Sequence, residues 1–191
     1  MALTQIEVKN WQKVAREYLD KAGIVLTTRE QDTIEIADLG LGEYEQTGVA
    51  LVVYYNDEKY CAKEMVLTPN QTCPQHMHPP IPRLDYVGKQ ETFRCRWGVV
   101  YLYVEGEGTK TPKAKPPQHR KEYYTVWHEI ILQPGDQFTI PPSTWHWFQG
   151  GPQGAVVSEF STRSADENDL FTDPEIQRTP EIIKLEKPVG L

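Results

Sequence analysis

The chain has 191 residues, a formal net charge of −7 and a sequence pI near 5.3. This acidic balance argues against a nucleic-acid partner and against an anionic membrane surface, because both bind a basic protein surface. No apolar run approaches the roughly 20 residues that span a bilayer, and the mean hydropathy is −0.57. The length suits one domain with its own core.

The cysteines and the first residues bear on the compartment. Cys61, Cys73 and Cys95 are odd in number and form no CxxC pair, which is typical of free thiols in a reducing compartment. The first 25 residues mix charged with apolar side chains and contain no signal-peptide core. We therefore expect a cytoplasmic protein.

Residues 4–22 are predicted to form an amphipathic helix. Thr4 and Glu7 have the spacing of a capping box, and Gly23 is a natural stop. Apolar side chains recur at three- and four-residue steps and form one stripe, which favours a helix packed over a sheet. These side chains are Val8, Trp11, Ala15, Tyr18, Leu19 and Ala22.

After this helix the hydrophobic period changes to two, and short strands alternate with Gly, Pro and Asn-Asp turns. This pattern indicates an all-β fold, an antiparallel barrel or sandwich, and not a parallel α/β sheet. The predicted strands are Thr33–Ala37, Val49–Tyr55, Tyr60–Leu67, Thr92–Val104, Tyr123–Leu132, Gln137–Ile140, Thr144–Phe148 and Ala155–Phe160.

Three segments are predicted to lie outside the strands. Residues 81–90 form an insertion with one proline and one glycine, and residues 105–121 form an exposed loop rich in proline and lysine. Residues 162–191 are polar and interrupted by prolines. This last segment is expected to wrap around the barrel or to reach a partner subunit.

Two histidine-bearing segments are the candidate metal site. His76 and His78 stand two residues apart, so on an extended strand their side chains point to the same face. Lys89 and Glu91 have the same relation. His146 stands between Trp145 and Trp147. On an extended strand, His146 is expected to face the interior while both indoles face outward. Three imidazoles and one carboxylate are a suitable ligand set for one divalent metal ion.

The spacing of these residues resembles the cupin family. Its first motif corresponds to His76-x-His78, then Glu91, six residues and Gly98, and its second to Gly135 through Pro141-x-Ser143 to His146. The sequence departs from the motifs in three places: twelve residues separate His78 from Glu91 where three or four are usual, Ser143 replaces a glycine, and Gly150 replaces an asparagine. The resemblance implies a single cupin domain over residues 1–191, an antiparallel jelly-roll β-barrel (33–161) with an N-terminal helix (1–25) and a C-terminal extension (162–191).

Within the cupins the chain resembles the D-lyxose isomerases. The likeness is carried by Lys89-x-Glu91 after the long gap, by the run from Gln137 to Phe148, and by Ser158-Glu159-Phe160-Ser161-Thr162. It implies an aldose–ketose isomerase that interconverts D-lyxose and D-xylulose, and also D-mannose and D-fructose. The implied metal ligands are His76, His78, Glu91 and His146, and the implied catalytic groups are Lys89 and Glu159. The implied cofactor is one divalent metal ion per subunit, most often manganese, with zinc, cobalt and iron as alternatives.

The chemistry of such a reaction fits these residue types. A metal ion with open positions can bind O1 and O2 of an open-chain sugar and polarise the carbonyl. Glu159 can then carry a proton between C2 and C1 through a metal-bound cis-enediol, and Lys89 can stabilise the enediolate oxygen or move a proton between oxygens. Without the resemblance, Lys89 would be expected in solvent, and Glu159 would be expected to pair with a neighbouring basic side chain.

Asp166 and Asp169 are candidate substrate-binding residues. They lie in a polar tract that follows Glu159 closely, so the tract is placed to cover the mouth of the barrel. The alternative for both aspartates is a solvated loop.

Two other functions use the same residues. An Fe(II)-dependent cupin dioxygenase would need the same open coordination site, and a non-catalytic sugar-binding cupin would bind sugar without turnover. The sequence does not decide the metal, the physiological sugar, or proton transfer against hydride shift. Aromatic strands favour a homodimer as the assembly.

Overall fold

The computed structural model describes residues 3–179. Helix α1 (Gln5–Lys21) has Thr4 as its N-cap, and Thr4 and Glu7 form both halves of the capping box, as predicted. A second helix, α2 (Thr28–Asp32), was not predicted, although Thr27 and Glu30 cap it with the same pair of residue types. At five residues it is too short for a periodic apolar stripe to reveal it.

The described residues form nine strands and three short 3-10 helices. The strands are β1 (Glu35–Ala37), β2 (Val49–Asn56), β3 (Cys61–Leu67), β4 (Thr72–Met77), β5 (Glu91–Val104), β6 (His128–Leu132), β7 (Gln137–Ile140), β8 (His146–Ser161) and β9 (Leu170–Phe171). The 3-10 helices are η1 (Pro82–Leu84), η2 (Gln118–Tyr123) and η3 (Asp166–Asn168).

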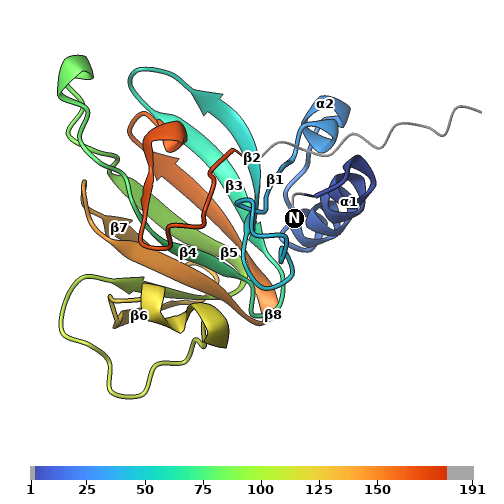
Figure 1. The fold of residues 1–191 in the computed structure, drawn as a ribbon. Coiled ribbons are helices and arrows are strands. Elements are labelled where there is room, and N and C mark those ends of the chain that lie inside the picture. Colours follow the sequence, from blue (N-terminus) through green and yellow to red (C-terminus); the bar gives the residue numbers. More distant parts are fainter. Residues whose placement is uncertain (1–2, 180–191) are drawn as a thin grey trace, which may run out of the picture.

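All pairs of strands are antiparallel, and one curled sheet results. Its order is β1-β2-β3-β8-β4-β9, while β5 pairs with β6, β7 and β8. The sheet curves around its core, and α1 and α2 lie outside it beside β1, β2 and β3 (Figure 1). Among the residues described, no helix is both long and apolar enough to cross a membrane.

The curvature is greatest along β5 and β8. Glu91 at one end of β5 pairs with Ser161, and Val104 at the other end pairs with His146. Fourteen residues of straight strand would separate these ends by roughly 40 Å. The side chains of Glu91 and His146 nevertheless touch, with 2.9 Å between His146 Nε2 and Glu91 Oε1. The β5–β8 ladder therefore folds back on itself.

This fold-back coincides with breaks in the strand register. The register shifts between Cys95 and Trp97 and again between Gly98 and Val100. On β8 the second shift leaves residues 151–154 between the partners of Gly98 and Val100. Bulges of this kind bend a strand and raise its local twist.

Two apolar clusters cover the two faces of the sheet. The larger cluster fills the barrel and includes Met65, Phe93 and Phe148. The second lies between the outside of the sheet and α1, where Leu19 is buried against residues of β2, β3 and β8. The predicted packing of the helix over the sheet is thus confirmed.

The strand predictions differ from the structure in three places. The segments Thr144–Phe148 and Ala155–Phe160 are the two halves of one strand, β8. The region of Tyr123 ends a 3-10 helix, and its strand begins only at His128. Strands β4 and β9 were not among those predicted, because Pro74 interrupts the pattern of β4 and β9 has only two residues. In the C-terminal extension, residues 162–179 lie on the barrel and 180–191 fall outside the described residues.

Gly98 offers a test of the fold-back. Gly98 and Gly23 have nearly the same left-handed backbone, with φ of +73° and +71°. A Cβ added at Gly98 would overlap the carbonyl oxygen of Gly154, whereas a Cβ added at Gly23 would have no atom within 4 Å. We expect Gly23→Ala to lower the free energy of unfolding by about 1–2 kcal/mol through its backbone conformation. Gly98→Ala should cost roughly 1–3 kcal/mol more, because β5 and β8 must move apart. Urea unfolding measures both, and equal losses would contradict the close packing.

Candidate active site

The four candidate metal ligands lie at strand ends that meet inside the barrel. His76 is in β4, His78 follows the end of β4, Glu91 begins β5 and His146 begins β8. His76 and His146 are direct partners across β4 and β8. All four side chains are buried, so their polar atoms do not face solvent as those of surface residues would.

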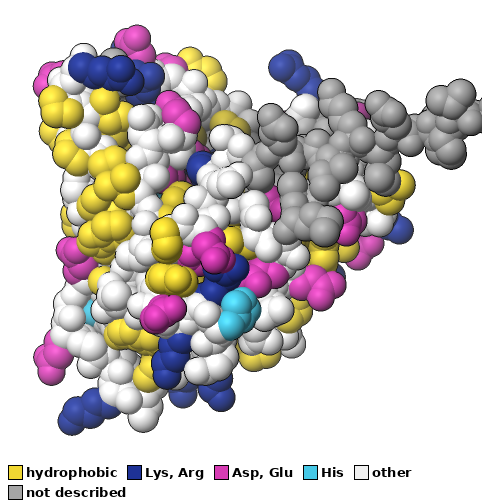
Figure 2. All heavy atoms as spheres, viewed as in Figure 1, with side chains coloured by type: hydrophobic (Ala, Val, Ile, Leu, Met, Phe, Trp, Pro, Cys, Tyr) yellow, Lys and Arg dark blue, Asp and Glu magenta, His cyan; other side chains and the backbone are white. Residues whose placement is uncertain are grey.

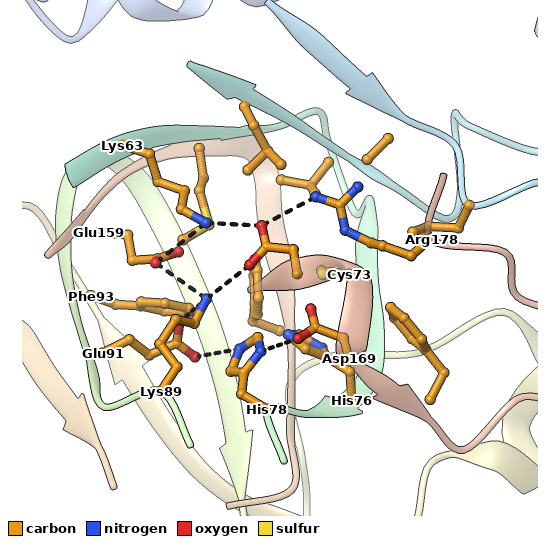
Figure 3. A pocket seen from close by; sticks show the side chains of 18 residues that line it. Lys63, Cys73, His76, His78, Lys89, Glu91, Phe93, Glu159, Asp169 and Arg178 are labelled. Atoms are coloured by element: carbon orange, nitrogen blue, oxygen red, sulfur yellow. Dashed lines mark hydrogen bonds and ion pairs between the residues drawn. The ribbon is translucent and has the colours of Figure 1, made fainter. Parts of the chain in front are cut away.

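Their ligand atoms converge on one place. One ring nitrogen from each of His76, His78 and His146 lies within 4.8 Å of the other two. Glu91 Oε1 is 2.9 Å from His146 Nε2 and 3.3 Å from His78 Nε2. Figure 3 shows His76, His78 and Glu91 along one wall of the pocket.

The outer nitrogens of the histidines fix which atom faces the centre. His76 Nδ1 lies 2.8 Å from the carbonyl oxygen of Pro74, and His146 Nδ1 lies 2.9 Å from that of Thr144. A carbonyl oxygen only accepts, so Nδ1 carries a proton in both rings, and Nε2 is the atom directed to the centre. His78 Nδ1 is held 2.5 Å from Asp169 Oδ1. Such contacts orient metal-binding histidines.

The atoms that face the centre have no hydrogen-bond partner among the described residues. They are His78 Nε2, Glu91 Oε1 and His146 Nε2, all buried. Buried polar atoms without partners are costly, and a divalent cation would satisfy all three. The residues present therefore fit a metal ion held by imidazole nitrogen and carboxylate oxygen.

The pKa values show how strongly these groups interact. Burial, together with His146 and His78, holds the pKa of His76 well below its usual range, which keeps this imidazole neutral. Burial and Lys89 lower the pKa of His78, but the carboxylates of Glu91 and Asp169 outweigh them and raise it to about 9. Burial raises the pKa of Glu91, yet Lys89 and the histidines hold it well below its usual range.

The two predicted catalytic groups lie next to this centre. Lys89 is 3% exposed, so the expectation of a solvated loop lysine is wrong. Its Nζ lies 2.9 Å from Glu91 Oε2 and 3.3 Å from Glu159 Oε1. Burial lowers the pKa of Lys89, but the carboxylates of Glu159 and Glu91 raise it well above its usual range, so the group is an ammonium ion.

Glu159 has an asymmetric environment. Its Oε1 accepts hydrogen bonds from Lys89 Nζ and from Ser161 Oγ at 3.0 Å, and it lies 3.5 Å from Lys63 Nζ. No described residue donates a hydrogen bond to Oε2, and Glu159 lines the pocket. The carboxylate pairs with basic side chains, as expected without the resemblance, while one oxygen stays free for another partner.

The long gap between His78 and Glu91 is accommodated by Ser143, the residue that replaces the motif glycine. Ser143 keeps the left-handed backbone of that glycine, with φ of +57°. Its hydroxyl donates to the carbonyl oxygen of Val87 at 3.1 Å. A Cβ on Gly88 would press against the carbonyl oxygen of His78 and against Ser143. The insertion is thus docked on the second motif, and it delivers Lys89 to the pocket.

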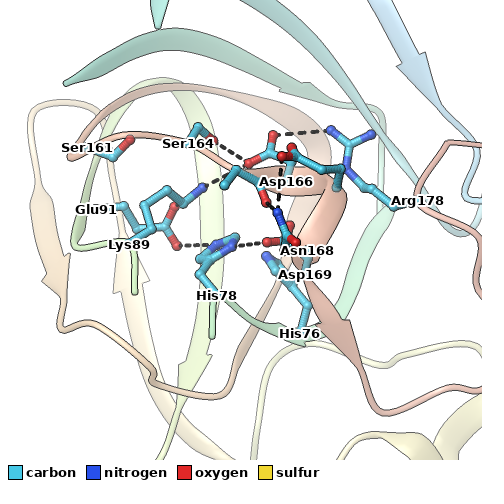
Figure 4. A network of polar contacts seen from close by, with 12 residues as sticks. His76, His78, Lys89, Glu91, Ser161, Ser164, Asp166, Asn168, Asp169 and Arg178 are labelled. Atoms are coloured by element: carbon cyan, nitrogen blue, oxygen red, sulfur yellow. Dashed lines mark hydrogen bonds and ion pairs between the residues drawn. The ribbon is translucent and has the colours of Figure 1, made fainter. Parts of the chain in front are cut away.

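The polar tract after β8 closes one side of the pocket, as Figure 4 shows. Asp166 Oδ2 lies 3.2 Å from both Lys63 Nζ and Arg178 Nη2, and Asp166 Oδ1 lies 3.7 Å from Lys89 Nζ. These three cations hold the pKa of Asp166 well below its usual range, although burial raises it. Because Asp169 contacts His78, both aspartates belong to the site, and neither is a freely solvated loop residue.

The sequence reasoning missed two cations of the site, Lys63 and Arg178. Lys63 had a detectable signal: it alternates with Cys61 and Met65 on the apolar face of β3, where a lysine is unusual. Arg178 had none, because it follows the barrel at a distance from every motif. It pairs with Glu35 at 2.5 Å as well as with Asp166.

Except for His146, the candidate ligands and catalytic groups line one pocket together with Lys63, Asp166, Asp169 and Arg178. Its free volume is about 40 Å³, so the side chains leave little empty space between them. Charged side chains make up one part of its lining, as Figure 3 shows for Lys63, Lys89 and Glu159. Apolar side chains, among them Leu51, Met65 and Phe148, make up another part. The pocket therefore suits a small polar molecule that binds a metal ion at one end.

A second cluster holds the C-terminal segment in place. Arg120 binds Glu43 at 2.8 Å, Asp173 at 2.7 Å and Glu175 at 3.1 Å, so it joins three distant parts of the chain. His119 also reaches Glu43. On the face drawn in Figure 2, acidic side chains likewise lie beside basic ones.

Comparison with known proteins agrees with this geometry. The sequence model of the D-lyxose isomerase family matches residues 7–191. A D-lyxose/D-mannose isomerase of Thermosediminibacter oceani is 58% identical over 94% of this chain and 98% of its own length. A D-lyxose ketol-isomerase of a Thermofilum species is 55% identical over 95% of this chain and 99% of its own length.

Solved structures support the fold. The L-ribose isomerase of Cellulomonas parahominis has a TM-score of 0.76 at 17% identity, covering 91% of this chain and 94% of that one. The L-ribose isomerase of Acinetobacter sp. DL28 in complex with L-ribose has a TM-score of 0.76 at 16% identity, covering 92% and 94%. Both the family match and these neighbours confirm the predicted all-β cupin barrel. The chain belongs to the D-lyxose isomerase family and is a cupin-fold sugar aldose–ketose isomerase.

Proposed function

We propose that this chain interconverts D-lyxose and D-xylulose, and also D-mannose and D-fructose, with the help of one divalent metal ion per subunit. The sugars come from the names of relatives that are more than half identical to it. The observation that carries the metal is the convergence of His78 Nε2, Glu91 Oε1 and His146 Nε2, which are buried and have no partner among the described residues. Manganese is the expected metal, with zinc, cobalt and iron as alternatives.

The proposed holders of the metal ion are His76, His78, Glu91 and His146. When bound, a divalent ion would supply Lewis acidity that polarises the carbonyl group of the open-chain sugar. Asp169 holds the ring of His78 through Nδ1, so its proposed role includes orienting a ligand besides contacting the sugar. Asp166, which lines the same pocket, is proposed to contact sugar hydroxyl groups.

Glu159 is the proposed carrier of the proton. Its free Oε2 takes the proton from C2 of the aldose, which leaves a cis-enediolate, and returns that proton to C1. Meanwhile the hydroxyl proton of O2 must move to O1. The ammonium group of Lys89, close to both Glu91 and Glu159, can stabilise the negative oxygen during this transfer.

The two alternative functions fit less well. A dioxygenase would use the same metal ligands, but neither Glu159 nor Lys89 would have a role in it, and the relatives are isomerases. A non-catalytic sugar-binding cupin would leave the Glu159 and Lys89 pair without a purpose. The cytoplasmic location expected from the sequence stays a prediction.

The metal site can be tested by substituting one ligand. His146→Gln should lower the metal affinity by at least about 100-fold. Loss of a residue that only hydrogen-bonds to a metal ligand already lowers metal affinity roughly 10- to 100-fold. Metal analysis after dialysis against Mn²⁺ should give one ion per wild-type chain and nearly none per His146→Gln chain. His128→Gln, a change at an exposed strand histidine, is the control and should keep one ion. Full occupancy in His146→Gln would contradict the assignment.

The catalytic proposal predicts a loss of turnover without a loss of metal. Glu159→Gln should lower kcat on D-lyxose by roughly 10²–10⁴-fold, the range of general acid–base catalysis. Glu167→Gln, at an exposed glutamate nearby, should leave kcat unchanged. Sugar chromatography measures conversion, and deuterium from D₂O in the product distinguishes proton transfer from hydride shift. Metal-loaded wild-type protein that leaves both D-lyxose and D-mannose unchanged would overturn the proposed function.

A homodimer is the proposed assembly, formed through the outer face of the sheet. In register across four strands, Tyr55 pairs with Ala62, Ala62 with Phe160, and Phe160 with Thr92. Tyr55 and Phe160 are about half exposed, and Tyr60 stacks on Tyr55 with 4.9 Å between ring centroids. Aromatic residues exposed together on a sheet are typical of an interface.

Light scattering after size exclusion tests this assembly. The wild type should show twice the chain mass of 22.0 kDa, and Phe160→Asp should shift it toward one chain. Val25→Asp, at a residue that is 92% exposed between α1 and α2, should leave the mass unchanged. A monomeric wild type, or a Phe160→Asp protein that stays dimeric, would contradict this interface.

A further inference from the structure

Lys63 is a buried cation to which the proposed reaction gives no role. Its side chain is 3% exposed on the inner face of β3, and its residue pairs directly with Glu159 across β3 and β8. Burial of a charged group is costly unless it is paired. Burial lowers the pKa of Lys63, but the carboxylates of Glu159 and Asp166 outweigh it and the net shift is upward, so the group is an ammonium ion.

The ammonium group of Lys63 has three partners. Its Nζ lies 3.5 Å from Glu159 Oε1, 3.2 Å from Asp166 Oδ2 and 3.1 Å from Ser164 Oγ. One partner is on β8, and the other two belong to the segment that closes the pocket, as Figures 3 and 4 show for Glu159, Ser164 and Asp166. The lysine therefore connects the barrel wall, the proposed base and the closing segment.

Lys63 differs from Lys89 in what else it contacts. Lys89 Nζ is closer to Glu91 Oε2, at 2.9 Å, than to Glu159 Oε1, at 3.3 Å, so the candidate metal ligand competes for it. Among the described residues, Lys63 makes no ion pair with any candidate metal ligand. Lys63 Nζ is likewise closer to Ser164 Oγ and Asp166 Oδ2 than to Glu159 Oε1, but neither of these partners is a candidate metal ligand.

The position of the contact matters as much as its charge. Lys63, Lys89 and Ser161 all approach Oε1 of Glu159, which leaves Oε2 without a donor from any described residue. A carboxylate held through one oxygen cannot rotate freely, so the other oxygen keeps a fixed direction. Proton transfer from carbon requires such a fixed direction, and an error of about 1 Å can cost roughly 100-fold in rate.

We propose that Lys63 is a positioning residue of this isomerase, whose ammonium group holds Glu159 by Oε1 so that Oε2 meets the carbon-bound proton of the sugar. This inference rests on the proposed function, because it assumes that Glu159 moves the proton. It gives Lys63 a role distinct from metal binding and from sugar binding, so its substitution affects kcat and leaves KM and metal content unchanged.

The test compares Lys63→Met and Lys63→Arg with the wild type on D-lyxose in Mn²⁺-loaded protein. Lys63→Met should lower kcat roughly 10- to 100-fold, with KM within about twofold and one metal ion per chain. Lys63→Arg retains the cation and should recover most of kcat. Lys59→Met, at an exposed lysine before the same strand, is the control. Thermal unfolding and metal content are measured on every variant, so that kcat refers to folded, loaded protein.

The outcomes separate this inference from the proposed function. Unchanged kcat in Lys63→Met would overturn it, and so would a raised KM with unchanged kcat, which would make Lys63 a sugar contact. If Lys63→Met does not fold, the Lys63→Arg protein is decisive. A folded, metal-loaded Lys63→Arg protein with wild-type KM and a kcat within about threefold of wild type supports positioning. Any other value of either constant contradicts it. A wild type without any turnover would instead refute the proposed function.

Discussion

The antiparallel pairing of β5 with β8 is the interaction on which the rest of this structure depends. The two strands pair from Glu91 and Ser161 at one end to Val104 and His146 at the other. Because the ladder folds back, its two ends supply a carboxylate and an imidazole to the same point. A flat sheet with the same pairing would keep them roughly 40 Å apart. The bend is therefore part of the site as well as part of the fold.

The site is also defined by how its charges are balanced. Three cations, Lys63, Lys89 and Arg178, lie among the carboxylates of the pocket. Each carboxylate has at least one basic partner, which offsets part of the cost of burying its charge. At the candidate metal site, three buried atoms contact one another but have no hydrogen-bond partner among the described residues. The other charged groups of the pocket thus have partners within the protein, whereas these three atoms are the ones that fit a bound cation.

The first helix and the histidine pair of the candidate site could be predicted from the sequence, because each depends on residues that are close together in the chain. The capping box of α1 is a spacing of three residues, and the pair His76 and His78 is a spacing of two. The joining of two predicted segments into β8 could not be read, because residues 150–154 look like a turn. Arg178 and Glu35 meet although 143 residues separate them. Such a pair is decided by the tertiary fold alone.

The order in which the chain is made adds a consequence to the C-terminal segment. The candidate metal ligands are complete once His146 has been synthesised, but the groups that orient and balance the site come later: Glu159, Asp166, Asp169 and Arg178. A nascent chain thus has all four candidate ligands while the pocket is still open on one side. During synthesis, the groups that surround the candidate ligands are therefore the last to become available to the site, and long-range contacts of this kind form slowly.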